Sequence, residues 1–209
     1  MTSHPNLINI LGFVAEGKGG GVEAGYTKLA TFSEFCSGMG VLGKPPSFTT
    51  VTRDVYPGGE PHLTLPQALA LARGVASAAG HLHAAGLSHG EFYAHNILVY
   101  RGLLGVGGAS KEKVGSLEAL EAGVKLGDLG ATFFYDRAGP SGKAVEQVEV
   151  RAWACLVEEL MGLVVGGGGE EGGKTKDTLL RLTTGPCKGE DNPKERPLFA
   201  QIVQELKAL

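Results

Sequence analysis

Hydrophobic and polar positions follow a helical spacing in the middle of the chain. After Thr64, apolar residues recur every three or four positions as far as Gly86, which predicts an amphipathic helix over residues 65–85. The segment from Thr64 to Gln67 is typical of a helix start, because each of these two side chains can hydrogen-bond the other residue's backbone amide. A proline in this first turn is tolerated, since an N–H there has no partner inside the helix.

Further helical patterns cover 144–163, 176–183 and 198–208. The first of these is rich in valine, leucine and alanine. Glycine-rich sequence at 164–173 follows it, and glycine loses more backbone entropy on folding than any other residue. We therefore expect an exposed, poorly ordered loop over 164–175.

Short apolar runs with β-branched residues predict strands. Residues 7–15 have the pattern of a buried strand, and the other expected strands are 26–36, 96–100 and 124–127. The prevalence of glycine, proline, serine and threonine between Gly38 and Gly59 favours an irregular surface segment.

A second insert is expected between two of these strands. Residues 101–122 are rich in glycine, serine, lysine and glutamate, which predicts an exposed, poorly ordered loop with a helical turn at 117–120.

The composition limits which binding partners and which cellular compartment we expect for this protein. The net charge is −3, so there is no basic excess of the kind that nucleic acid attracts. No apolar run reaches the roughly 18 residues of a membrane span, and residues 1–17 lack a signal-peptide pattern. The three cysteines, Cys36, Cys155 and Cys187, are far apart, which favours reduced thiols in an intracellular, cytoplasmic protein. We expect Cys155 to be a core residue and Cys187 to have no nucleophilic role.

The segment 89–98, HGEFYAHNIL, carries the clearest chemical pattern. His89 is followed by an acid at Glu91 and by Asn96 seven positions on, and Asp128-Leu129-Gly130 lies 32 residues beyond Asn96. The first pattern resembles the protein-kinase catalytic loop H-R-D-L-x-x-x-N, and the second resembles the D-F-G motif of the same family.

Other segments are similar to kinase landmarks in the same order. They are His4-Pro5-Asn6, which resembles the turn after helix C, residues 65–85 (helix E), 149–160 (helix F) and Arg196-Pro197-Leu198-Phe199, which resembles the start of the last helix. The resemblance extends from residue 4 to residue 209.

The resemblance implies an α+β, protein-kinase-like fold: a mainly α-helical C-lobe with a remnant of the N-lobe strands. Residues 1–60 would be the remnant N-lobe and hinge, and 61–209 the C-lobe. It implies ATP-dependent phosphoryl transfer to protein hydroxyls. Glu91 would be the base or hydroxyl-orienting residue, and Asn96 and Asp128 would hold Mg²⁺ beside ATP, because Mg²⁺ prefers oxygen ligands. The implied partner is a protein substrate or a scaffold partner, and by the same resemblance His89 is a buried residue that bonds the backbone.

The chain departs from the family at several positions. No glycine-rich loop and V-A-I-K-type strand precede His4, Glu91 replaces aspartate, Gly90 replaces arginine, and Tyr93 stands where a serine/threonine kinase has lysine. We therefore expect this chain alone to transfer little or no phosphate, with at most weak Mg²⁺-ATP affinity. The alternative is a pseudokinase scaffold without turnover.

No A-P-E triplet follows Gly130. In the kinase family the glutamate of that triplet pairs with the arginine that corresponds to Arg196. Glu146 and Glu149 are the candidates for this role.

Two other sequence patterns would indicate a function different from that of a kinase. Gly168 to Thr175 formally fits the phosphate-binding P-loop, with Lys174 as its lysine, and would indicate a P-loop NTPase. A helical pattern precedes it where a P-loop needs a strand, and Glu170 and Glu171 would repel phosphate. Histidines also cluster in the sequence, but their spacing does not form a compact tetrahedral zinc set; they are His81, His83, His89 and His95.

Overall fold

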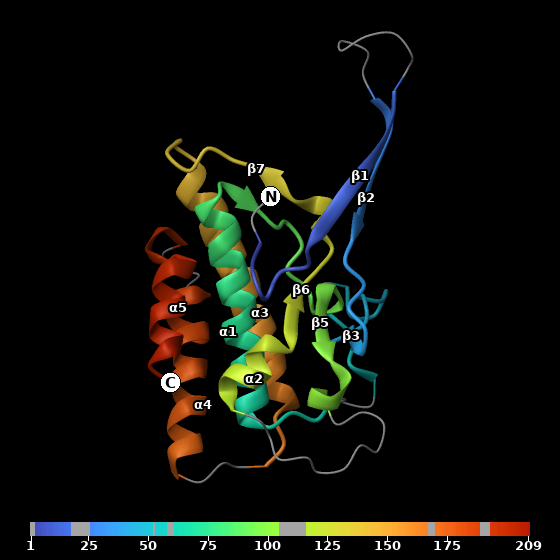
Figure 1. Cartoon of the computed structure of the whole chain (residues 1–209). Coiled ribbons are helices and arrows are strands. Elements are labelled where there is room, and N and C mark those ends of the chain that lie inside the picture. The colour runs from blue at the N-terminus through green and yellow to red at the C-terminus, as the bar shows by residue number, and fades with distance from the viewer. Residues whose placement is uncertain are drawn as a thin grey trace.

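The computed structural model describes residues 3–17, 26–51, 53–57, 61–104, 116–166, 170–188 and 193–209. Figure 1 shows long helices packed side by side, with most of the strands lying to one side of them. The fold is therefore of the α+β class.

The described helices are α1 (Leu65–Ala84), α2 (Leu117–Ala122), α3 (Gly142–Leu163), α4 (Glu170–Leu182) and α5 (Phe199–Lys207). The described strands are β1 (Ile10–Gly17), β2 (Tyr26–Ser33), β3 (Met39–Val41), β4 (Leu87–Ser88), β5 (Ile97–Tyr100), β6 (Val124–Leu126) and β7 (Phe133–Phe134). Short helical turns are η2 (Ala94–Asn96), η3 (Arg101–Leu104), η4 (Leu129–Ala131), η5 (Thr183–Cys187) and η6 (Pro193–Glu195). Among the described residues, no helix is long and apolar enough to span a membrane.

Helix α1 begins as the sequence predicts. The Thr64 hydroxyl accepts a hydrogen bond from the Gln67 amide at 3.4 Å, and the Gln67 side chain accepts one from the Thr64 amide at 2.6 Å. Both are the bonds of a capping box, so the predicted start is confirmed. The helix is rich in buried alanines, which let α3 approach closely enough for the Trp153 indole N–H to reach the Ala72 carbonyl at 3.0 Å.

The core lies between α1, α3 and α5. Trp153 of α3 is fully buried and packs edge-to-face on Phe199 of α5, with ring centroids 6.2 Å apart. Leu160 and Ile202 are also fully buried. These large side chains from two helices fill the space beside the small residues of α1, which makes the helical body a close-packed unit.

A three-stranded antiparallel sheet in the order β3-β5-β6 connects this body to the candidate loop. The buried side chain of Asn6 ties the sheet to α2, because its amide nitrogen donates to the Glu121 carbonyl at 2.7 Å and the Val124 carbonyl at 2.9 Å. Strand β5 directly follows the segment with Glu91 and Asn96, and β6 ends at Leu126, two residues before Asp128. The sheet therefore sets the separation of the two motifs.

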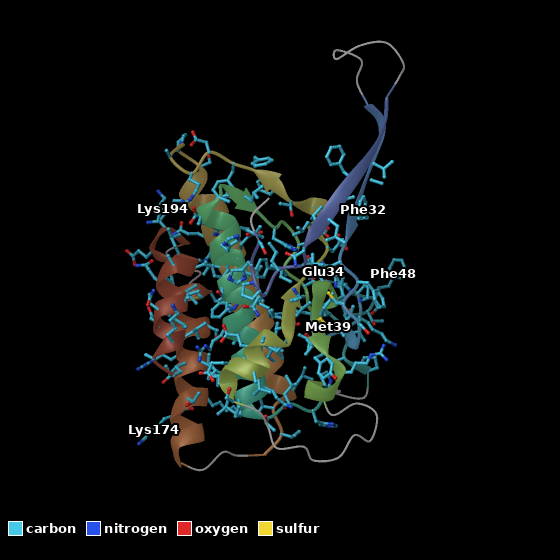
Figure 2. The ribbon with its side chains drawn as sticks, in the orientation of Figure 1. Phe32, Glu34, Met39, Phe48, Lys174 and Lys194 are labelled. Carbon is cyan, nitrogen blue, oxygen red and sulfur yellow. The ribbon has the colours of Figure 1, made fainter. Side chains whose placement is uncertain are left out.

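The first predicted strand differs from its expectation. It begins at Ile10, not at residue 7, and is exposed, not buried: Leu11, Phe13 and Val14 are 63%, 62% and 63% exposed. It pairs with β2 in a two-stranded hairpin that projects from the body (Figure 1). Figure 2 shows Phe32, which is 52% exposed, on this hairpin. An apolar run is buried only where another layer covers it, and the described hairpin is a sheet of two strands.

Two predicted loops also contain helices. Residues 117–122 form α2, longer than the predicted turn at 117–120, because Leu120 is buried against the body. Residues 170–175 belong to α4, so the prediction of a loop over 164–175 is wrong there. Buried leucines further along α4 offset the cost of its glycines, which is about 1 kcal/mol each. The parts of these predictions at 105–115 and 167–169 lie outside the described residues.

Candidate functional site

His89 is the buried centre of the candidate loop. Its Nε2 is 2.8 Å from the Gly127 carbonyl, and its Nδ1 accepts from the Glu91 amide at 3.3 Å. Because Nδ1 accepts, the ring proton lies on Nε2, which donates to Gly127. Burial lowers the pKa of His89 from its ordinary value, which favours this neutral form. The prediction that His89 is a buried residue bonding the backbone is confirmed.

Asn96 links the loop to the turn before Asp128. Its side-chain nitrogen donates to the Glu91 carbonyl at 3.1 Å, and its own carbonyl accepts from the Gly127 amide at 2.8 Å. Gly127 thus receives a hydrogen bond from His89 and donates one to Asn96 through the two sides of its backbone. The structure in this way brings the backbone segments of Glu91, Asn96 and Asp128 together.

Asp128 adopts an unusual backbone conformation. Its φ is 50° and its ψ is 77°, in the left-handed region that non-glycine residues rarely occupy. The side chain offsets part of the cost of this conformation, since its Oδ1 accepts a hydrogen bond from the Gly130 amide at 3.1 Å. Aspartate tolerates this conformation better than most residues because its short side chain bonds the local backbone. The residue is exposed, so the carboxylate is accessible to a cation.

The backbone conformation at position 90 requires glycine. Its φ is +85°, and a Cβ atom added there would lie 2.7 Å from the Ala131 carbonyl oxygen. The arginine that kinases carry at this position would therefore disturb the loop as it is built here. The Gly90 amide donates to Glu149 Oε1 at 2.6 Å, which anchors the loop to α3.

Glu149 is a positioning residue that the sequence did not identify as such. Its other oxygen accepts from His83 Nε2 at 2.6 Å, and the carboxylate is buried. Burial alone would raise the pKa of Glu149, but the hydrogen bonds from His83 and Gly90 outweigh it and hold that pKa below its ordinary value. The sequence pointed to Glu149 only as a candidate partner of Arg196.

Arg196 was expected to pair with Glu146 or Glu149. Its guanidinium donates to the carbonyls of Gln147 and Lys188 at 3.5 Å and 3.4 Å. Glu146 accepts from the Tyr135 hydroxyl at 2.8 Å and from Arg137 Nε at 3.1 Å. Both candidate glutamates therefore serve contacts that the sequence did not predict.

Tyr93 is held at the rim of the loop by His95. The two rings stack with centroids 5.2 Å apart, and His95 Nδ1 bonds Asp54 Oδ1 at 2.7 Å. The other Asp54 oxygen accepts from the Ala94 amide. This contact between a residue before α1 and the loop has no motif, so nothing in the sequence pointed to it.

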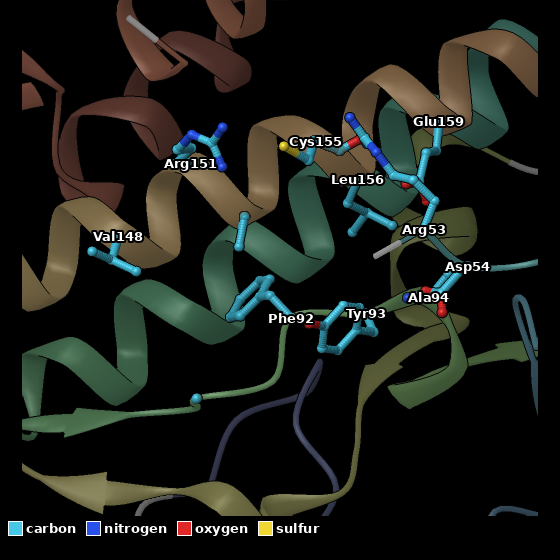
Figure 3. Close-up of a pocket in the computed structure, with 12 residues that line it drawn as sticks. Arg53, Asp54, Phe92, Tyr93, Ala94, Val148, Arg151, Cys155, Leu156 and Glu159 are labelled. Carbon is cyan, nitrogen blue, oxygen red and sulfur yellow. Dashed lines mark hydrogen bonds and ion pairs between the residues drawn. The ribbon is translucent and has the colours of Figure 1, made fainter. Parts of the chain in front are cut away.

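A cavity of about 390 Å³ lies beside the loop and under α3. Figure 3 shows Phe92 and Tyr93 on one side of it, with Val148 and Cys155 of α3 on the other. Cys155 is only half-buried, so the prediction of a core cysteine is wrong: it lies on the side of α3 that faces this cavity. Cys187 is buried, and burial raises its pKa to about 12, which agrees with a non-nucleophilic role.

The remaining sequence patterns are the histidine cluster and the P-loop match. Across the described parts of the chain, no group of three or more His, Cys, Asp or Glu side chains is placed to hold a metal ion. Lys174 lies inside α4, and the element before it is α3 where a P-loop needs a strand.

A scan against protein-family models found no match to this sequence, and a search of curated proteins found no significant match.

Proposed function

We propose that this chain is part of a protein-kinase-like domain whose family activity is ATP-dependent phosphoryl transfer to protein hydroxyls. In this proposal residues 61–209 are the mainly helical C-lobe and residues 1–60 are the remnant N-lobe and hinge. The proposal includes an intracellular, cytoplasmic location, which the three free cysteines support.

The supporting observation is the hydrogen bonding around Gly127. The two motifs that resemble the kinase family are separated by 32 residues in the sequence. They meet in space because His89 bonds one side of the Gly127 backbone and Asn96 bonds the other. Two unrelated turns would have no reason to be joined at this point, directly before Asp128.

The donor set suits Mg²⁺. The nitrogen of the Asn96 side chain donates to the Glu91 carbonyl, so the side-chain oxygen is the atom that would bind the cation in this proposal. Asp128 contributes a carboxylate. Magnesium accepts one or two protein oxygens and completes its shell with water and phosphate oxygens. In this proposal Asn96 and Asp128 hold Mg²⁺-ATP, which supplies the phosphoryl group, while the exposed Glu91 orients the acceptor hydroxyl.

A pseudokinase scaffold is the second candidate, and Gly90 favours it. The loop geometry leaves no room for any side chain at this position, so the arginine of an active kinase would not fit. The glycine-rich loop and lysine that align ATP phosphates in kinases are also missing from the 209 residues. We therefore expect transfer by this chain alone to be weak or absent.

A phosphotransfer assay on residues 1–209 tests the proposal. Generic protein substrates are incubated with Mg²⁺-ATP and the chain, its Asp128→Ala variant, or the control variant Asp136→Ala, which removes another exposed aspartate. The expected result is little or no transfer from all three. Transfer should appear when an in-frame upstream stretch with a glycine-rich loop and lysine is added, and Asp128→Ala alone should then abolish it.

Robust transfer by residues 1–209 that disappears in Asp128→Ala would show that the expectation of impairment is wrong. Nucleotide binding that depends on Lys174 but not on Asp128 would support the P-loop NTPase instead. A stable chain that stays inactive with any extension would favour the pseudokinase scaffold.

A further inference from the structure

His83 of α1 is a buried histidine that lies between two buried glutamates of α3. Its Nε2 is 2.6 Å from Glu149 Oε2, and its Nδ1 is 3.8 Å from Glu146 Oε2. The side chains of all three residues are at most 6% exposed. Within the described residues, Nδ1 has no hydrogen-bond partner. The ring therefore faces one carboxylate through each of its nitrogens.

The other groups around the ring are two aromatic side chains and one arginine. Tyr135, which follows β7, lies edge-on to His83 with ring centroids 6.0 Å apart, and Phe199 of α5 lies 5.2 Å away. Burial and the hydrogen bond to Glu146 raise the pKa of Tyr135 above its ordinary value, so its hydroxyl keeps its proton. The arginine is Arg137, which is bound to Glu146 and is 49% exposed.

Both glutamates are held in their ionised form. Glu146 Oε1 accepts from the Tyr135 hydroxyl at 2.8 Å and from Arg137 Nε at 3.1 Å. Burial would raise the pKa of Glu149, but the hydrogen bonds from His83 and the Gly90 amide hold it below its ordinary value. Donors to a carboxylate favour its charged form. Two buried negative charges therefore lie on either side of the ring.

A neutral ring could not satisfy both contacts. The 2.6 Å contact to Glu149 requires a proton on Nε2, because an ionised carboxylate can only accept. In a neutral ring Nδ1 would then be an acceptor as well, and it would face the Glu146 carboxylate, which is also an acceptor. A proton on Nδ1 turns this repulsion into an ion pair, and buried charges are tolerated when they are paired.

We propose that His83 is a doubly protonated imidazolium shared by Glu146 and Glu149, and that it positions the two segments of the candidate site. Through Glu149 it holds the Gly90 amide of the candidate loop. Through Glu146 it holds Tyr135, in the segment that follows the Asp-Leu-Gly turn. The link needs only these contacts, so it stands whether or not the chain transfers phosphate.

His89 is the comparison that the chain itself offers. Both rings are buried, with His83 2% and His89 0% exposed. His89 bonds two backbone groups, the Gly127 carbonyl and the Glu91 amide, and burial lowers its pKa, so it is neutral. The two histidines should differ in protonation because of their partners, since their burial is nearly the same.

The test is NMR of the histidine ring nitrogens on the whole ¹⁵N-labelled chain, with the ring signals assigned through the backbone. The pH is about 7.5, where an ordinary histidine, with a pKa of about 6.5, is mostly neutral. We expect protons on both nitrogens of His83 and on Nε2 alone of His89. A singly protonated His83 would overturn the inference.

Glu146→Gln is the sharpest variant. The glutamine oxygen can still accept from Tyr135, and its amide can donate to an unprotonated Nδ1. His83 should therefore lose one proton and show the pattern of His89 while the chain stays folded. The control Glu118→Gln, at an exposed glutamate of α2, should leave both protons in place. A doubly protonated ring in Glu146→Gln would contradict sharing between the two acids.

Hydrogen exchange tests the positioning role. The Tyr135 amide donates to the Gly86 carbonyl at 3.0 Å. Over the rise in pH in which the His83 ring loses its Nδ1 proton, exchange at Tyr135 should accelerate several-fold more in the wild-type chain than in Glu146→Gln. The Gly90 amide should respond alike in both proteins, since Nε2 still donates to Glu149. Equal acceleration at Tyr135 in the two proteins would show that the proton does not position this segment.

Discussion

The helical body and the β1–β2 hairpin use similar apolar residues in opposite ways. In the body, Trp153, Phe199 and Leu160 are at most 1% exposed. In the hairpin, Phe13 and Leu11 are more than 60% exposed. Both regions have strongly hydrophobic sequences, so hydrophobicity alone does not predict burial: a segment is buried only where other elements cover it.

The hairpin is apolar on both of its faces. Successive residues of a strand point to opposite faces, so Phe13 and Val14 lie on different sides, and both are largely exposed. Strands of this kind are typical of sheet interiors covered on both sides. The body has a complete core, whereas the hairpin has the composition of a sheet without its covering layers, and the two regions should respond differently to mutation.

Trp153→Ala is the strongest test of the body. We expect the free energy of unfolding to fall by about 3–5 kcal/mol, because a fully buried ring is replaced by a cavity and the hydrogen bond from the indole N–H to the Ala72 carbonyl is lost. Urea unfolding followed by far-UV circular dichroism measures this. Trp153→Phe, which keeps most of the volume, should lose clearly less, and equal losses for the two variants would contradict close packing at this site.

Glu149→Gln tests the link between the body and the loop. Loss of a buried carboxylate that accepts from His83 and Gly90 should lower the free energy of unfolding by about 2–3 kcal/mol at neutral pH. Because the folded-state pKa of Glu149 is held below its ordinary value of 4.5, its stabilisation is fully present above that pH and is lost as the pH falls through the folded pKa.

The wild-type chain should therefore lose more stability than Glu149→Gln between neutral and acidic pH. Urea unfolding at a series of pH values compares them. Parallel curves for the two proteins would show that Glu149 does not carry this pH dependence.

Gly90→Ala tests the loop itself. A left-handed φ and a close carbonyl predict a loss of about 1–3 kcal/mol, with displacement of the loop. Gly162→Ala in α3 is the matched control, because a Cβ atom there would meet nothing within 4 Å. The control should be neutral or more stable by about 0.4–1 kcal/mol, and a harmless Gly90→Ala would refute the described loop geometry.

Phe13→Ser should have the smallest effect on stability. The side chain is 62% exposed on the hairpin, so the free energy of unfolding should change by no more than about 0.5 kcal/mol. Binding of a hydrophobic fluorescent dye should decrease, since the variant removes an exposed ring. A large loss of stability would mean that the hairpin is integrated with the core, and the contrast between the two regions would fail.

The sequence predicted what depends on local patterns. The capping residues Thr64 and Gln67 located α1 almost to the residue, and the strands at 96–100 and 124–127 were expected within a residue. Features that depend on tertiary packing could not be predicted from the sequence. The exposure of Phe13 and the helix over 170–175 both depend on which elements of the fold pack against these segments.

The candidate site shows the same division. His89 could be placed from its motif, and its burial follows the expectation. The role of Glu149 could not be predicted in this way, because its partners His83 and Gly90 are far from it in sequence. A buried hydrogen bond between distant residues leaves no periodic or motif signal in a single sequence.

The central claim is that Asn96 and Asp128 serve one cation site, and the most direct measurement uses Mn²⁺ as a paramagnetic substitute for Mg²⁺. Backbone amide NMR signals are recorded during titration with a small amount of Mn²⁺ for the chain, Asn96→Ala and Asp128→Ala. The account predicts that the amides of Gly127 and Gly130 broaden first, and that either substitution removes this selective broadening. Broadening centred elsewhere on the chain, or unchanged broadening at Gly127 and Gly130 in either variant, would contradict a shared site.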